Sequence, residues 1–274
     1  MKRTKRTHGV AAFDAYYGSL FGNRWPALRA ALMETTQPVA FSIGDGKPYY
    51  LDRASIYAAQ ALPETDEGRC LDMCAAPGGK TLVLASRMGE NTRLQANELS
   101  KARRMRLIKT LEEHVPTHTR TRIEVTGFDA SRLPRYQQAC YDRILLDTPC
   151  SSERHVLAGP KYLERWTPAR ITTLAQRQWA LLSAAFLLLK TGGFLIYVTC
   201  ALSGTENDGV VQRLLKKYGN AAIIRDASPP IPCEKTAFGC SFLPDLCAGA
   251  GPLYFSLIEK ASDCKITEGT AHSC

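Results

Sequence analysis

Two cysteines and one aspartate follow short apolar segments and could together act on an electrophilic carbon. Asp147 and Cys150 come after the apolar run 144–146, and Cys200 comes after the run 194–198. A thiolate is the protein group best suited to adding to C6 of a cytosine ring, whose C5 atom is poorly nucleophilic before that addition. A carboxylate beside the ring could help to stabilise charge on the N3 and N4 edge. These residue types favour nucleophilic catalysis on a base, although a cysteine taken alone is more often a small buried core residue.

A glycine-containing loop is predicted to hold a nucleoside cofactor. The segment 74–80, with sequence CAAPGGK, lies between a predicted strand and a predicted helix, which is where open α/β sheets bind ligands. Its two glycines allow a tight turn and a close approach of the backbone. Glu98 follows Gly79 by 19 residues, near the spacing of about 20 at which an acidic side chain meets ribose hydroxyls. ATP is not favoured, because a phosphate-binding loop would need glycine at position 74, where cysteine stands.

Short apolar runs alternate with amphipathic stretches from residue 66 onward, which predicts an α/β fold with a mostly parallel sheet flanked by helices. In such a sheet the cofactor loop and both cysteines lie at the carboxyl edge. A Ser100 cap begins one expected helix, which runs to about Glu113. The expected strands are 70–73, 93–97, 122–126, 141–146, 194–199 and 253–257, and further helices are expected over 167–192 and 206–218.

The chain divides into three regions. Residues 1–65 combine a basic start with an aromatic-rich stretch and predict a mainly helical N-terminal extension with a loop near 44–48. Residues 66–260 form the predicted catalytic domain, and residues 261–274 form a C-terminal tail that we expect to be flexible.

Composition restricts the partners and the compartment. Lys and Arg outnumber Asp and Glu by 35 to 26, so the formal charge of +9 suits a polyanionic partner without requiring one. Ten cysteines in 274 residues are too few for a disulfide scaffold, which favours reduced thiols inside a cell. The apolar run 179–189 is far shorter than the roughly 20 residues of a membrane helix. No apolar segment follows the basic start, so secretion is not expected.

Three segments resemble the signatures of the Sun/Nop (NSUN-type) family of RNA (cytosine-5)-methyltransferases. They are 72–81 (DMCAAPGGKT), 147–152 (DTPCSS) and 197–202 (YVTCAL), the last followed by Glu206 and Asn207. The resemblance covers residues 65–258, and Arg154 and His155 resemble the small mitochondrial-type branch and its bacterial relatives. It implies a class I (Rossmann-like) methyltransferase fold that uses S-adenosylmethionine.

The resemblance also implies catalytic roles. Cys200 would be the nucleophile, Cys150 would assist release of the enzyme from the methylated base, and Asp147 would lie between cofactor and cytosine. The group that removes the C5 proton is left open between Cys150 and a water molecule.

For the cofactor, the resemblance assigns the ribose to Glu98, the bracing of Glu98 to Arg103, and the adenine amine to Asp129. The backbone that would hold the methionine moiety comprises Cys74, Ala75, Ala76, Pro77, Gly78, Gly79 and Lys80. The chain departs from the family where Glu98 replaces a commoner Asp, where Val198 and Ala201 replace frequent serines, and where residues 152–155 replace a commoner glycine-containing loop.

RNA phosphates would be contacted by basic side chains, although charges on a helix face are usually only solvated. The candidates are Lys2, Arg3, Lys5, Arg6, Lys101, Arg104, Arg106, Lys161 and Arg165. The N-terminal aromatic residues could stack on bases, but packing on the catalytic domain is favoured for most of them. Cys233, Cys240 and Cys247 lack paired C-x-x-C spacing, so no metal is predicted.

Two other functions remain open. A DNA cytosine-5-methyltransferase would use Cys150 as the nucleophile, and an RNA-binding ribosome-assembly factor would use the fold without catalysis. Retention of Cys150, Cys200, Asp147 and Lys80 argues against the assembly factor. Ribosomal RNA is favoured over transfer RNA, and a protein partner or a ribosomal particle could supply RNA affinity. The protein would act in the cytoplasm of a bacterium or in the mitochondrial matrix of a eukaryote, and no membrane contact is expected.

Overall fold

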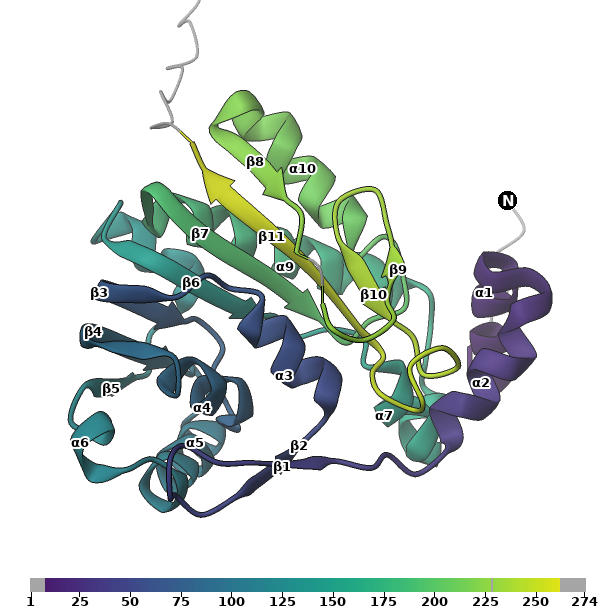
Figure 1. Ribbon diagram of the computed structural model, residues 1–274. Helices are drawn as coiled ribbons and strands as arrows, with labels where there is room; N and C mark the ends of the chain where they lie inside the picture. The colour runs from purple at the N-terminus through teal and green to yellow at the C-terminus, as the bar shows by residue number, and fades with distance from the viewer. Residues whose placement is uncertain (1–7, 228, 262–274) are drawn as a thin grey trace, which may run out of the picture.

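The computed structural model describes residues 8–227 and 229–261, and its centre is a twisted sheet (Figure 1). The strands of this sheet are β3 (Thr65–Asp72), β4 (Met88–Asn97), β5 (Ile123–Thr126), β6 (Tyr141–Asp147), β7 (Leu189–Thr199), β8 (Ala222–Arg225), β9 (Glu234–Lys235), β10 (Cys240–Phe242) and β11 (Leu253–Lys260). Strands β5-β4-β3-β6-β7 lie side by side in parallel, and β11 joins β7 in antiparallel direction. The chain order reverses between β3 and β6, so the loops after these strands meet at one edge.

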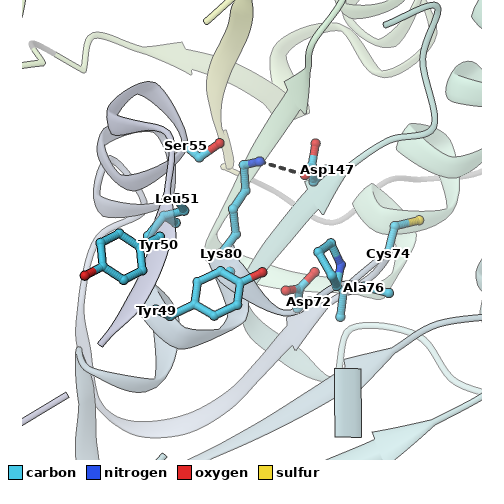
Figure 2. A pocket seen from close by; sticks show the side chains of 12 residues that line it. Tyr49, Tyr50, Leu51, Ser55, Asp72, Cys74, Ala76, Lys80 and Asp147 are labelled. Atoms are coloured by element: carbon cyan, nitrogen blue, oxygen red, sulfur yellow. Dashed lines mark hydrogen bonds and ion pairs between the residues drawn. The ribbon is translucent and has the colours of Figure 1, made fainter. Parts of the chain in front are cut away.

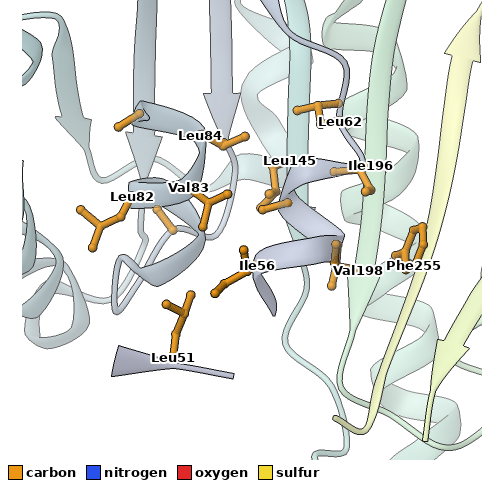
Figure 3. Packing of buried hydrophobic residues seen from close by; sticks show 14 of the residues in the cluster. Leu51, Ile56, Leu62, Leu82, Val83, Leu84, Leu145, Ile196, Val198 and Phe255 are labelled. Atoms are coloured by element: carbon orange, nitrogen blue, oxygen red, sulfur yellow. The ribbon is translucent and has the colours of Figure 1, made fainter. Parts of the chain in front are cut away.

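Helices cover both faces of the sheet (Figure 1). The helices on the faces are α3 (Arg53–Gln60), α4 (Gly79–Ala85), α5 (Lys101–His114), α9 (Ala169–Leu188) and α10 (Asp208–Tyr218). The shorter helices are α6 (Thr117–Arg120), α7 (Glu153–Ala158) and α8 (Pro160–Glu164), of which α7 packs against α2 (Trp25–Met33) and α8 against α1 (Val10–Phe21). Leu145 of β6 packs with α3, α4 and α5, whereas its neighbours Ile144 and Leu146 pack with α9 and α10. Successive side chains of a strand point to opposite faces, so a strand covered on both sides is apolar throughout. Figure 3 shows the first of these two cores, in which Ile56 of α3 lies beside Val83 of α4.

All six expected strands are present, and Ser100 caps α5 by accepting a hydrogen bond from the Arg103 amide. The helix expected over 167–192 is wrong at its end, because α9 ends at Leu188 and β7 begins at Leu189. Gly192 and Gly193 lie inside β7, where a Cβ atom at Gly193 would approach the Asp142 carbonyl oxygen to 3.0 Å. Gly193 therefore marks a close approach to β6, whereas Gly192 has open space around it and a φ of +76°, a conformation that favours glycine.

The N-terminal extension is mainly helical, as expected, and packs on the rest of the protein. Helices α1 (Val10–Phe21) and α2 (Trp25–Met33) bury Phe13, Tyr17 and Trp25 against Trp166. The expected loop lies between two short strands that the sequence did not predict, β1 (Val39–Phe41) and β2 (Tyr49–Leu51). The N-terminal aromatic residues thus serve packing. The tail at 262–274 lies outside the described residues.

Candidate active site

The loop between β3 and α4 and the first turn of α4 carry the expected cofactor residues: Cys74 to Gly78 lie in the loop, and Gly79 and Lys80 begin the helix. Gly78 has a φ of +120°, and a Cβ atom there would lie 2.9 Å from Thr110 of α5, so both the turn and the packing require glycine. Two cavities adjoin this loop, and Cys74 lines both of them. The first is also lined by Tyr49 and Tyr50 of β2, as Figure 2 shows.

Glu98, Arg103 and Asp129 line the second cavity, together with Leu99 and Phe128. Glu98 is almost fully buried, and its Oε2 lies 3.5 Å from Arg103 Nη1. The Arg103 guanidinium also donates to the Ala76 carbonyl oxygen at 2.7 Å, which ties the cofactor loop to Glu98. The three side chains expected around a nucleoside therefore surround one cavity, and their contacts with a cofactor stay a prediction.

Asp72 is a site residue that the sequence patterns did not single out. It ends β3, lines the first cavity and is 1% exposed. Its Oδ2 accepts a hydrogen bond from the Thr81 hydroxyl, but its Oδ1 has no donor among the described residues. Burial, with a contribution from the nearby charge of Asp147, raises the pKa of Asp72 to about 7. An unpartnered carboxyl oxygen in this cavity suits a ligand that brings a cationic amine.

Lys80 and Asp147 form an ion pair at the boundary between the first cavity and a larger one. Lys80 Nζ donates to Asp147 Oδ2 at 2.7 Å (Figure 2). Burial acts to lower the pKa of Lys80, but the Asp147 carboxylate outweighs it and leaves the pKa above its ordinary value. Both residues also line a third cavity of about 540 Å³, along with Cys200 and His155. The pair therefore joins the cofactor loop to a space large enough for a base.

Cys150 and Cys200 lie side by side, with 2.8 Å between their sulfur atoms. Cys150 Sγ accepts a hydrogen bond from the Cys200 amide, and the Ser152 hydroxyl lies 3.0 Å from Cys200 Sγ. The hydrogen bond with Cys200, together with burial, raises the pKa of Cys150 well above its ordinary value. Cys150 is therefore held as a thiol that can donate to Cys200. Among the described residues, those lining the third cavity include Cys200 but not Cys150.

The expected RNA-contacting residues are dispersed. Lys101 and Arg106 are exposed on α5, whereas Arg104 donates to the Glu98 carbonyl oxygen. Lys161 and Arg165 are exposed beside α7 and α8. The basic residues at positions 2–6 lie outside the described residues.

The segment 152–155, expected as a loop, begins helix α7, and its two basic side chains have different contacts. Arg154 donates to the carbonyl oxygens of Glu34, Gly249 and Gly251, which makes it a support between segments. His155 is exposed at the third cavity, with its ring centroid 4.8 Å from that of Tyr162.

Cys233 and Cys240 also form a close pair, with sulfur atoms 2.8 Å apart, and Cys247 donates to the Pro232 carbonyl oxygen. Within residues 8–227 and 229–261, no group of three or more His, Cys, Asp or Glu side chains is arranged to hold a metal ion. In the same part of the chain, no helix has the length and apolar character needed to cross a membrane.

Residues 59–239 match the family model of the 16S rRNA methyltransferases RsmB/F. The chain belongs to this family. The RsmB/F-type chain is 34% identical to the bovine 5-cytosine rRNA methyltransferase NSUN4, in a match that covers 78% of the present chain. It is 36% identical to ribosomal RNA small subunit methyltransferase F of Aeromonas salmonicida, in a match that covers 69% of the present chain. A zebrafish mitochondrial tRNA (cytosine(34)-C(5))-methyltransferase is 37% identical over 63% of the chain. The matches span 60%, 40% and 47% of those three relatives.

Solved structures agree with this family. NSun6 from Pyrococcus horikoshii, solved with SFG, superposes with a TM-score of 0.68 at 27% identity, over 80% of this chain and 54% of that one. A methyltransferase homologue from the same organism gives a TM-score of 0.71 at 20% identity, over 90% and 94%, which shows the fold alone. The mostly parallel sheet is thus that of the class I methyltransferases, as expected from the sequence.

Proposed function

We propose that the protein transfers a methyl group from S-adenosylmethionine to C5 of a cytosine in RNA, with Cys200 as the nucleophile. One observation carries the proposal: Cys200 lines a cavity of about 540 Å³ that shares Lys80 and Asp147 with the cavity of the cofactor loop. A base in one cavity and a cofactor in the other would meet at this pair of residues.

The cofactor cavities fit S-adenosylmethionine in the chemistry of their side chains. Glu98 and Asp129 would hold the ribose and the adenine, and the backbone of residues 74–80 would hold the methionine part. The unpartnered Oδ1 of Asp72 would receive the methionine ammonium. SFG in the NSun6 structure is an analogue of this cofactor and supports the assignment. The cofactor supplies an electrophilic methyl group.

The protein's own residues would perform the remaining steps. Cys200 would add to C6 as a thiolate and form a carbon–sulfur bond, with the Ser152 hydroxyl 3.0 Å from its sulfur and Lys80 lining the same cavity. Asp147 would accept from the N4 amine while the electron pair moves toward C5, where the methyl group is received. A base then removes the C5 proton, the ring electrons return, and Cys200 leaves as a thiolate. Cys150 lies 2.8 Å from the departing sulfur and can assist this release.

RNA is proposed as the substrate because the named relatives act on RNA. Ribosomal RNA is favoured over transfer RNA by the family description and by two relatives, while the zebrafish relative acts on tRNA. His155 offers a ring at the third cavity, with the exposed ring of Tyr162 beside it, and exposed Lys161 and Arg165 would contact phosphates. A ribosomal particle or a partner protein would add affinity. The site of action would be the bacterial cytoplasm or the mitochondrial matrix.

Methyl transfer from labelled cofactor tests the proposal. Three substrates are offered to each enzyme: transcripts of small-subunit rRNA, total tRNA, and a DNA copy of the rRNA region. The enzymes are the wild type, Cys200→Ala and Cys140→Ala. Cys140 is a matched control, because it is a free cysteine just before β6, at the end of the strand opposite Asp147. We expect label in RNA, a loss of about 1,000-fold or more in Cys200→Ala, and wild-type activity in Cys140→Ala. Label in DNA alone, or an active Cys200→Ala, would contradict the proposal.

A further inference from the structure

Two fully buried carboxyl groups, Glu153 and Glu206, lie behind the loop that carries Cys150. Glu153 Oε1 accepts hydrogen bonds from the hydroxyls of Tyr17 and Ser151, and its Oε2 accepts from the Leu202 amide at 3.0 Å. Both oxygens of Glu153 are therefore engaged by donors. This pattern fits an ionised carboxylate, which only accepts.

Glu206 has a different pattern. Its Oε2 accepts from the Ser151 amide at 3.0 Å and from the Gln178 side-chain amide at 2.8 Å. Its Oε1 is buried and has no donor within the described part of the chain, and the same holds for Gln178 Oε1. Glu206 and Gln178 already share one hydrogen bond, yet each keeps a buried oxygen without a donor, which is unusual in a protein interior. A single proton on Glu206 Oε1, donated to Gln178 Oε1, would satisfy both.

We infer that Glu206 is a neutral carboxylic acid paired with the Gln178 amide by two hydrogen bonds, and that this pair positions Cys150. The Gln178 amide also donates to the Pro149 carbonyl oxygen at 3.0 Å, while Glu206 accepts from the Ser151 amide. The pair therefore holds the backbone on both sides of Cys150. Glu206 and Gln178 are positioning residues, since they act on the reaction through Cys150.

The electrostatics of the pocket favour this arrangement. Two carboxylates buried close together rarely ionise at once. Burial raises the pKa of Glu153 as well, but the hydrogen bonds from Ser151, Tyr17 and the Leu202 amide oppose that rise, so we assign the charge to Glu153. Burial and the charge of Glu153 raise the pKa of Glu206 to about 7. The other titratable groups that face it are the phenols of Tyr17 and Tyr197, and the Tyr197 hydroxyl donates to the Glu206 carbonyl oxygen. The protonation of Glu206 does not depend on the proposed function, whereas its role in positioning Cys150 rests on that function.

Paired substitutions and infrared spectra test the inference. Gln at position 206 would present the same donor and acceptor as the neutral acid, whereas Gln at 153 would direct an N–H toward groups that donate. We expect Glu206→Gln to methylate RNA within about threefold of the wild type, and Glu153→Gln to lose about tenfold or more. Glu206→Ala should accumulate a protein–RNA adduct, as expected of Cys150→Ala. The spectrum of the wild type near pH 6, minus that of Glu206→Gln, should contain the carbonyl stretch of a protonated carboxyl group.

The spectrum is decisive even where Glu153→Gln fails to fold, because it needs only the wild type and the folded Glu206→Gln. A difference spectrum with only carboxylate bands, or an equal loss of activity in the two Gln variants, would overturn the inference. If the spectrum contains the band of the protonated carboxyl group but the wild type methylates neither RNA nor DNA, Glu206 is still a neutral acid. In that case the positioning role is refuted, and the result counts against the proposed function.

Discussion

Ser152 combines an unfavourable backbone with a useful hydroxyl. Its φ of +53° lies in the left-handed region, which costs a residue with a Cβ atom about 1–2 kcal/mol. Sequences of the resembling family more often have a glycine-containing loop here. We propose that the serine hydroxyl, 3.0 Å from Cys200 Sγ, compensates for this strain, because it could donate to the thiolate of the proposed nucleophile.

Two substitutions at position 152 distinguish the effect of the hydroxyl on methyl transfer from the effect of the backbone strain on stability. Ser152→Ala and Ser152→Gly both remove the donor, so both should slow methyl transfer by roughly tenfold, which is the value of one hydrogen bond to a charged group. Only glycine removes the strain, so Ser152→Gly should unfold at a higher temperature than Ser152→Ala. Single-turnover rates and thermal unfolding measure the two effects. Wild-type rates in both variants would exclude the donor role of Ser152.

We expect Asp72 to make the affinity for S-adenosylmethionine depend on pH. With a pKa of about 7, Asp72 is mostly neutral at pH 6 and cannot pair with a cationic amine, so cofactor affinity should rise as the pH increases from 6 to 7. The rise should be at most about tenfold. Asp72→Asn should bind more weakly and show a flat profile over the same range. Titration calorimetry with S-adenosylmethionine tests this, and a wild-type profile in Asp72→Asn would refute it.

At the scale of elements, the strands were the easiest part to predict. The carboxyl-terminal parts of β3, β6 and β7 are buried on both faces, so short apolar runs mark them in the sequence. The strands of the hairpin β1–β2 are apolar but only three residues long, and they are mostly half-buried or exposed, so only the loop between them was predicted. Gly192 and Gly193 indicated a helix end locally, but they lie inside β7, where its register with β6 shifts between residues 189 and 194.

Helix α1 is attached to the catalytic domain by aromatic packing. Phe13 is fully buried against Trp166, whereas Leu20 on the same helix is 50% exposed. Phe13→Ala should therefore lower the free energy of unfolding by about 3–5 kcal/mol. Leu20→Ala, the matched control, should change it by less than about 0.5 kcal/mol. Denaturant unfolding measures both, and equal effects would show that α1 is not held by this packing.

At the scale of the whole molecule, two buried acids should make stability depend on pH. Asp72 and Glu206 have pKa values of about 7 in the folded protein, against ordinary values of 3.8 and 4.5. The folded state then binds more protons between about pH 4.5 and 7, so stability is highest below that window and is lost as the pH rises through it. Each group contributes at most about 1.4 kcal/mol per pH unit.

Denaturant unfolding between pH 5 and 8 measures this dependence. We expect the free energy of unfolding of Glu206→Gln to fall less steeply with pH than that of the wild type between pH 5 and 7. Above pH 7 the two curves should be parallel. Identical slopes in the two proteins would show that Glu206 does not hold a proton in the folded state.

The sequence predicted the part of the site that follows strand ends and left the rest unpredicted. The residues Glu98, Asp147 and Cys200 each follow or end a strand of one parallel sheet, so topology brings them together. The network around Glu153 and Glu206 joins segments that are 28 to 136 residues apart. No local spacing predicts such contacts, and only the fold reveals which buried oxygens lack a donor.

The central assignment is that Cys200 attacks the base and Cys150 releases it. The most direct measurement is the recovery of a covalent protein–RNA adduct on denaturing gels, with the attached residue identified by mass spectrometry. The account predicts that Cys150→Ala, incubated with RNA and S-adenosylmethionine, accumulates an adduct at Cys200, and that the double variant Cys150→Ala, Cys200→Ala forms none. An adduct attached to Cys150 in Cys200→Ala would contradict it.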